Sequence, residues 1–187
     1  MRSLIVFRHG KSDWRADEGD DQTRPLSARG RRSASAMGRF LAAAGQVPEL
    51  ALTSPALRAT ETLHLAVEAG RWTCEVRTRE ALYAGVDEVL AELRLLPPDV
   101  VTAMVVGHEP TSSELTAMLI GGGRIRLATA AMARIDLDLE RWPDLGPGCG
   151  ELAWLLPPRL AEDGVLGVGR GASEDAGSAK GRRRRPS

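Results

Sequence analysis

The chain has 187 residues, a length that suits one domain with some trailing sequence. Hydrophobic residues make up 43% and charged residues 27% of it, a balance that is typical of a globular protein. Lysine and arginine together number 25, as do aspartate and glutamate, so the zero net charge gives no argument for nucleic acid or an anionic membrane as the partner.

Targeting signals are not expected from the sequence. The apolar stretch Leu4–Phe7 near the N-terminus is too short for the core of a signal peptide, and no apolar run approaches the length of a membrane span. Cys74 and Cys149 lie far apart and form no Cys-x-x-Cys pattern, which favours two reduced thiols. We therefore expect a cytoplasmic protein without a membrane partner.

Apolar runs and helix-boundary residues predict the elements of the first half of the chain. Residues 3–8 form an apolar run typical of a buried strand, and 11–26 form a polar loop with five carboxylates. These carboxylates lack the regular spacing of a cation loop, so we expect them to be hydrated and to hold no metal. Ser27 is the predicted N-cap of a helix that ends at Gly45. The next predicted elements are a strand at 50–53, a helix opened by Ser54 and Pro55 that runs to about Ala69 and is closed by Gly70, and an edge strand at 73–77.

The second half continues the alternation of helices and strands and then loses it. The predicted elements are a helix at 86–95, a strand at 100–106, a helix at 111–120 and two late strands at 131–139 and 151–156. This order predicts a three-layer α/β/α sandwich with a mostly parallel sheet that is mixed at one edge. The domain is predicted to cover residues 1–157, and 158–187 to be a disordered tail with four consecutive arginines, Arg182 to Arg185, close to its end. A solubilising tail is favoured over one that contacts nucleic acid or acidic protein.

Three of the predicted strands are followed by residues that suit phosphate binding. Arg8-His9-Gly10 lies at the carboxyl end of the first, Ser54 to Arg58 follows the second, and Gly107-His108 follows the fourth. The carboxyl ends of parallel strands meet at one edge of a sheet, so these groups are predicted to converge. Arg58 also lies in the first turn of a helix, where free backbone N–H groups favour anions. Two arginines and two histidines at one edge predict a pocket for a dianion.

The order and spacing of these motifs resemble the histidine phosphatase superfamily, which is also called phosphoglycerate mutase-like. The resemblance covers roughly residues 1–157. It rests on three segments, Phe7-Arg8-His9-Gly10, Ser54-Pro55-Ala56-Leu57-Arg58-Ala59-Thr60-Glu61-Thr62 and Val105-Val106-Gly107-His108-Glu109-Pro110. The segment Arg24-Pro25-Leu26-Ser27 with Arg29-Gly30, together with the short chain, is similar to the SixA-type phosphohistidine phosphatase branch.

The resemblance implies a metal-independent phosphatase that works through a phosphohistidine intermediate and needs no cofactor. His9 is then the nucleophile, while Arg8, Arg58 and His108 stabilise the charge of the transferring group. Further candidate substrate-binding residues are Arg24, Ser12 and the backbone of Gly10, and Arg24 is equally compatible with a surface position. His64 belongs to no motif and is expected to be a surface or packing residue.

The general acid and the substrate stay open at this level. Many superfamily members protonate the leaving oxygen with a carboxyl group after the third strand, and Glu80 lies in that region; it is a candidate acid, a rim residue or a helix-leading carboxylate. The preferred substrate is a phosphohistidine protein, whose leaving nitrogen can be protonated before it departs. The alternatives are a small phosphoester such as a sugar phosphate, turned over with Glu80 as the acid, or a phosphate-binding module without turnover.

Overall fold

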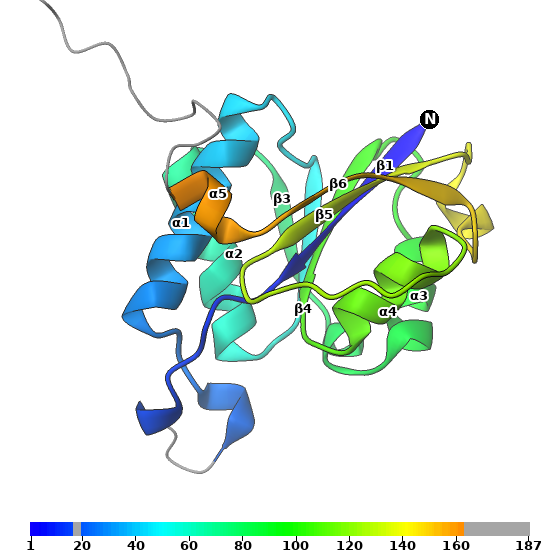
Figure 1. The fold of residues 1–187 in the computed structure, drawn as a ribbon. Coiled ribbons are helices and arrows are strands. Elements are labelled where there is room, and N and C mark those ends of the chain that lie inside the picture. Colours follow the sequence, from blue (N-terminus) through cyan, green and yellow to red (C-terminus); the bar gives the residue numbers. More distant parts are fainter. Residues whose placement is uncertain (17–19, 163–187) are drawn as a thin grey trace, which may run out of the picture.

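The computed structural model describes residues 1–16 and 20–162, and its centre is a six-stranded sheet. The strand order is β3-β2-β4-β1-β5-β6. β1 pairs in parallel with β4, as β2 does with β3 and β4, whereas β5 and β6 are antiparallel (Figure 1). The predicted mostly parallel sheet with a mixed edge is therefore confirmed. The strands are β1 (Arg2–Arg8), β2 (Leu50–Thr53), β3 (Glu75–Thr78), β4 (Thr102–Gly107), β5 (Met132–Leu137) and β6 (Gly150–Leu156).

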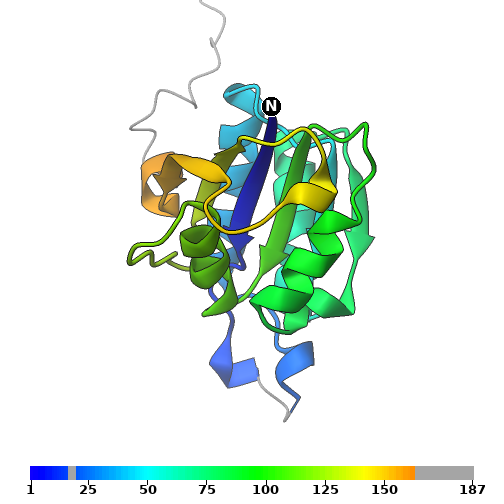
Figure 2. The same cartoon turned by 90° about the vertical axis from the view of Figure 1, so that its right-hand side faces the viewer.

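Helices cover both faces of the sheet, as the three-layer prediction requires. One face carries α1 (Ala28–Ala43), α2 (Leu57–Gly70) and the short α5 (Pro158–Glu162), and the other carries α3 (Val86–Arg94) and α4 (Thr111–Leu119) (Figures 1 and 2). Successive residues of β1 point to opposite faces, so Ile5 packs with the α1 and α2 side and Leu4 with the α3 and α4 side. Burial of apolar side chains on both faces fixes the sheet between two cores.

The starts of α1 and α2 differ in how well local signals predict them. Ser27 is the N-cap of α1, and its hydroxyl accepts a hydrogen bond from the Gly30 N–H, as predicted. The predicted start of α2 at Ser54 and Pro55 was wrong, because Ala56 is the N-cap of this helix and Leu57 is its first residue. Ser54 lies before the helix, where its hydroxyl contacts His108 at 2.8 Å. The helix closes on Arg71 in the left-handed conformation, one residue after the predicted stop at Gly70.

The predicted tail begins with ordered structure. α5 occupies residues 158–162, directly after the predicted domain boundary at 157, and Leu160 packs against the core on the α1 and α2 side. The boundary therefore falls at least five residues later than predicted, and the rest of the predicted tail lies outside the described residues. Within the described ranges, no helix combines the length and the apolar character needed to cross a membrane.

Candidate active site

The carboxyl ends of β1, β2 and β4 bring the predicted motifs together. The strands are in register so that Arg8 pairs with Gly107 and Thr53 with Val106. The residues that follow stay linked by the backbone: the His9 N–H donates to Gly107 O at 3.0 Å and the Ser54 N–H donates to Val106 O at 3.0 Å. His9, Ser54 and His108 therefore meet at one sheet edge, where open α/β sheets bind ligands.

A pocket of about 450 Å³ opens at this edge. Six of the predicted site residues line it, namely Arg8, His9, Ser12, Arg24, Arg58 and His108. Five further residues that the motif analysis did not assign to the site also line it, namely Lys11, Trp14, Arg29, Glu109 and Thr129. The lining holds five arginine and lysine side chains, Arg58 included, and only one carboxylate, so the pocket is suited to an anion.

His9 is held in the state that a nucleophile requires. Its Nδ1 lies 2.7 Å from Gly10 O, and because a carbonyl oxygen only accepts, Nδ1 carries the ring proton and Nε2 keeps its lone pair. The imidazole is 8% exposed. This burial, together with the charges of the neighbouring His108 and Arg58, lowers the pKa of His9 to about 3. The ring is therefore neutral near pH 7.

His108 faces His9 with its ring centroid 5.0 Å from that of the nucleophile candidate. Burial, followed by the charge of Arg58, lowers the pKa of His108 to about 4, so its ring carries a single proton near neutral pH. Ser54 Oγ accepts from Ala56 N at 3.4 Å and has its own proton left to donate to His108 Nε2 at 2.8 Å. The remaining ring proton then resides on Nδ1, which is buried and has no partner within the described residues.

Arg8 and Arg58 each use one side of the guanidinium to fix its position. Arg8 Nη1 donates to Leu127 O at 2.7 Å, and Arg58 Nη2 donates to Asp21 Oδ2 at 2.8 Å. The Nε–H groups of both arginines are buried and have no partner in the described part of the chain. A buried donor without a partner is costly, so these groups indicate a binding place for oxyanion oxygens.

Asp21 organises the mouth of the pocket, a role that the motif analysis did not foresee. Its carboxylate contacts Arg58 at 2.8 Å and Arg24 at 2.7 Å, and it accepts a hydrogen bond from the Tyr83 hydroxyl at 2.8 Å. The bond from Tyr83 and the two arginines lower the pKa of Asp21. The group is thus ionised at neutral pH and draws Arg24, which is only 5% exposed, into the site.

Gly10 has a different role from the one predicted for it. Its N–H is already bonded to Thr62 Oγ1 at 2.9 Å, so this group is not available to a substrate, and its carbonyl orients His9. A Cβ on Gly10 would lie 2.9 Å from Gly30 O, and a Cβ on Gly30 would lie 2.2 Å from Lys11 O. Close approach of α1 to the loop after β1 therefore requires both glycines.

Glu80 is not brought into the pocket. It is exposed at the start of the short 3-10 turn Glu80–Tyr83 and is not among the lining residues. Tyr83, at the other end of this turn, contacts the site instead, with its ring 5.2 Å from that of His108. The carboxylate that does line the pocket, Glu109, accepts a hydrogen bond from Ser113 Oγ at 2.6 Å.

Comparisons with known proteins agree with this geometry. The family model of the histidine phosphatase superfamily (branch 1) matches residues 4–83. An uncharacterized protein of Mycobacterium tuberculosis is 35% identical over 165 residues, which span 82% of this chain and all of that protein. The solved structure of the protein histidine phosphatase SixA in complex with tungstate has 27% identity and a TM-score of 0.73, and covers 84% of this chain and 97% of that chain. A protein of Nakamurella multipartitia assigned by name as phosphohistidine phosphatase SixA has 29% identity and a TM-score of 0.74, over 84% of this chain and 96% of that chain.

The fold and the two-histidine, multi-arginine pocket define a class of phosphoryl-handling α/β proteins. The chain belongs to the histidine phosphatase superfamily, and its fold is the phosphoglycerate mutase-like one that the sequence predicted. Members of this superfamily are phosphatases, and the structural likeness to SixA phosphohistidine phosphatases extends over most of the chain.

Proposed function

We propose that this protein is a phosphohistidine phosphatase that removes a phosphoryl group from a protein histidine by way of a phosphorylated His9. The observation that carries the proposal is the state of His9: Nδ1 is fixed by Gly10 O, and the free lone pair on Nε2 belongs to a residue that lines the pocket. The Nε–H groups of Arg8 and Arg58, which have no hydrogen-bond partner among the described residues, belong to side chains that line the same pocket.

The proposed reaction has two displacements at phosphorus. His9 Nε2 forms a bond to phosphorus while the phosphorus–nitrogen bond of the substrate breaks, and the leaving nitrogen takes a proton from solvent. Water then attacks the phosphorus of phospho-His9, the bond to Nε2 breaks and inorganic phosphate leaves. The water proton passes to solvent, so the neutral imidazole is restored for the next cycle.

Fixed positive charge and hydrogen-bond donors stabilise the transferring group in both steps. Arg8 and Arg58 place their Nε–H groups toward the non-bridging oxygens, and His108 adds its Nδ1–H. Donors that are in place before the reaction need no reorganisation as charge develops. These side chains supply the charge stabilisation without a metal ion, so turnover is expected to continue in the presence of EDTA.

A nitrogen leaving group fits the carboxylates of this site better than an alkoxide does. An alkoxide must be protonated as it leaves, which calls for a carboxylic acid at the pocket. Glu80 lies outside the pocket, and the contacts of Asp21 lower the pKa of its carboxyl group and keep it ionised. The carboxylate that lines the pocket, Glu109, is engaged by the hydroxyl of Ser113, which donates to its Oε1 at 2.6 Å. The solved SixA structure supports the same substrate class, since that neighbour is a protein histidine phosphatase that binds the phosphate-like oxyanion tungstate.

Phosphate release with EDTA present tests the proposal on two substrates, a phosphohistidine protein and a panel of sugar phosphates. We expect wild type and Glu80→Gln to hydrolyse the phosphohistidine protein at similar rates and His9→Ala to lose the activity. His64→Ala is the matched control, because it removes a histidine that is exposed on α2 and should leave the rate unchanged. Circular dichroism establishes that every variant is folded.

Two other results would replace the proposal. Hydrolysis of sugar phosphates that is lost in both His9→Ala and Glu80→Gln would make this a small-molecule phosphatase with Glu80 as its acid. Folded wild-type protein that binds inorganic phosphate and releases none from any substrate would make it a phosphate-binding module.

A further inference from the structure

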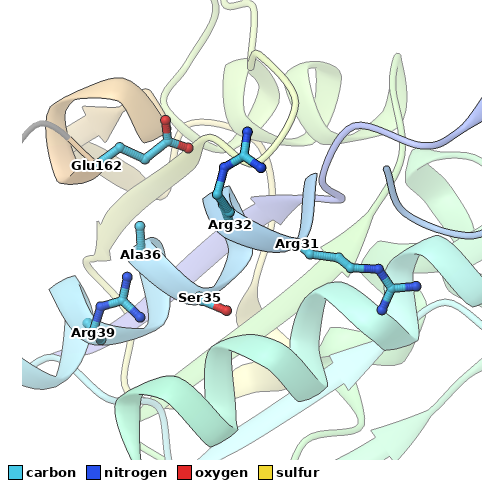
Figure 3. Close-up of a pocket in the computed structure, with 6 residues that line it drawn as sticks. All are labelled: Arg31, Arg32, Ser35, Ala36, Arg39 and Glu162. Carbon is cyan, nitrogen blue, oxygen red and sulfur yellow. The ribbon is translucent and has the colours of Figure 1, made fainter. Parts of the chain in front are cut away.

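A second, strongly basic hollow lies beside α1, away from the histidines. It measures about 520 Å³ and is lined by Arg31, Arg32, Ser35, Ala36 and Arg39 of α1 and by Glu162 of α5. Figure 3 shows Arg32 and Arg39 on the helix α1 side of this hollow and Glu162 across from them. Ala36, which is buried, separates the two arginines and leaves room between them.

All the charged side chains of α1 are positive. The helix contains four arginines, Arg29, Arg31, Arg32 and Arg39, and no acidic residue. Arg31 is neutralised by Glu61, whose carboxylate oxygen lies 2.8 Å away. No ion pair links Arg29, Arg32 or Arg39 to another residue within 1–16 and 20–162, and all three are exposed. Three cations on one helix that have no ion-pair partner in the described part of the chain repel one another, so an anionic partner would relieve this repulsion.

These three arginines connect the hollow to the catalytic pocket. Arg29, with Lys11, lines the pocket that contains His9, and Arg32 and Arg39 line the hollow. Spacings of three and seven residues keep Arg29, Arg32 and Arg39 on one side of the helix, about 15 Å long at 1.5 Å per residue. We call this set the α1 arginine face. It is a row of three positive charges whose first member, Arg29, lines the pocket and whose other two line the hollow.

We infer that the α1 arginine face binds an acidic segment of the protein that carries the phosphohistidine, so that the substrate lies along α1 with its phosphoryl group in the pocket. The inference rests on the proposed function and adds a partner chemistry to it. A strip of about 15 Å is longer than a small phosphorylated metabolite, whose anionic groups the pocket alone accommodates. Complementary charge of this kind raises the rate of encounter and sets the orientation of the bound partner.

Synthetic phosphohistidine peptides of equal length provide the test. One has glutamates on both flanks, the other has glutamines, and free phosphoramidate serves as the substrate without flanks. For wild type we expect kcat/KM to be about tenfold higher for the glutamate peptide at about 0.1 M ionic strength, and this preference to shrink at about 1 M, where charges are screened within about 3 Å. In the double variant Arg32→Glu/Arg39→Glu the preference should disappear, while hydrolysis of phosphoramidate stays unchanged.

The matched control reverses the same number of charges elsewhere. Arg71 and Arg141 are exposed and line neither the pocket nor the hollow, so Arg71→Glu/Arg141→Glu should keep the full preference for glutamate flanks. A preference that survives Arg32→Glu/Arg39→Glu, or that the control variant also loses, would overturn the inference. So would a loss of phosphoramidate hydrolysis in Arg32→Glu/Arg39→Glu, because the arginines would then support the pocket itself.

A binding measurement separates this inference from the proposed function. Failure of wild type to hydrolyse phosphoramidate and both peptides would contradict the phosphohistidine activity alone. Fluorescence anisotropy of the labelled peptides, with His9→Ala as the background, still reports docking without turnover. Tighter binding of the glutamate peptide that requires Arg32 and Arg39 supports the face. Equal binding of both peptides contradicts the proposed role of the α1 arginine face. Sedimentation that shows these arginines joining two copies of the chain contradicts it as well.

Discussion

The burial of His9 makes the free energy of unfolding depend on pH in a way that can be measured. The pKa of His9 is about 3 in the folded protein, against 6.5 for an ordinary histidine. Below pH 6.5 the unfolded chain therefore binds a proton that folded His9 does not bind. Stability is greatest above this value and falls as the pH is lowered from about 6.5 towards about 3.

The size of the effect follows from this window. About pH 5 lies roughly 1.5 units below the unfolded pKa and still above the folded one, and each unit is worth about 1.4 kcal/mol. The proton on unfolded His9 thus lowers the free energy of unfolding by about 2 kcal/mol at this pH. His108, with a folded pKa of about 4, contributes a loss of similar size.

Urea unfolding at about pH 7.5 and about pH 5, followed by tryptophan fluorescence in buffers without phosphate, tests this reasoning. Wild type should lose about 2 kcal/mol more than His9→Asn between the two conditions, and His108→Asn should differ from wild type by a similar amount. Carboxylates titrate alike in all three proteins and cancel in the comparison. Equal losses in wild type and His9→Asn would refute the claim that His9 is kept neutral by its surroundings.

Two further substitutions test the packing and the orientation of the site. Gly30→Ala places a Cβ against Lys11 O, so we expect a loss of about 1–3 kcal/mol in thermal unfolding, and an unchanged melting temperature would contradict the close approach of α1. Ser54→Ala removes the partner of His108 Nε2 and should lower kcat about tenfold with little change in KM. A Ser54→Thr variant that restores kcat would support the hydroxyl as the positioning group, and a wild-type kcat in Ser54→Ala would exclude it.

Local signals in the sequence were sufficient where one segment determines its own structure. Ser27 lies three residues before Gly30 and caps α1, and alternating apolar residues place β1 between two cores. Ser54 carries the same N-cap signal, yet its hydroxyl is used by His108, which is 54 residues away. A tertiary contact thus displaced the start of α2, and no local pattern could have indicated it.

The residues of the candidate site also fall into those that the sequence predicted and those that only tertiary contacts bring there. Arg8 is the last residue of β1, and His9 and His108 directly follow β1 and β4, so sheet topology alone predicted that they converge. Asp21 lies in a polar loop, and its carboxylate is organised by Arg58 and by Tyr83, 37 and 62 residues further along the chain. Its composition indicated only a hydrated loop. Asp21 lies three residues before Arg24, and the 2.7 Å contact between them became visible only in the folded structure.

The most direct test of the account is to look for the phosphoryl group on His9 during turnover. Wild-type protein that is hydrolysing phosphoramidate is quenched rapidly with alkali, in which phosphohistidine survives. The quenched protein is digested with a protease, and the resulting peptides are examined by mass spectrometry. The account predicts a phosphoryl group on the peptide that contains His9, and none on the peptides that contain His64 or His108. Phosphate release with no modified His9 at any quench time, or with the phosphoryl group on another residue, would contradict it.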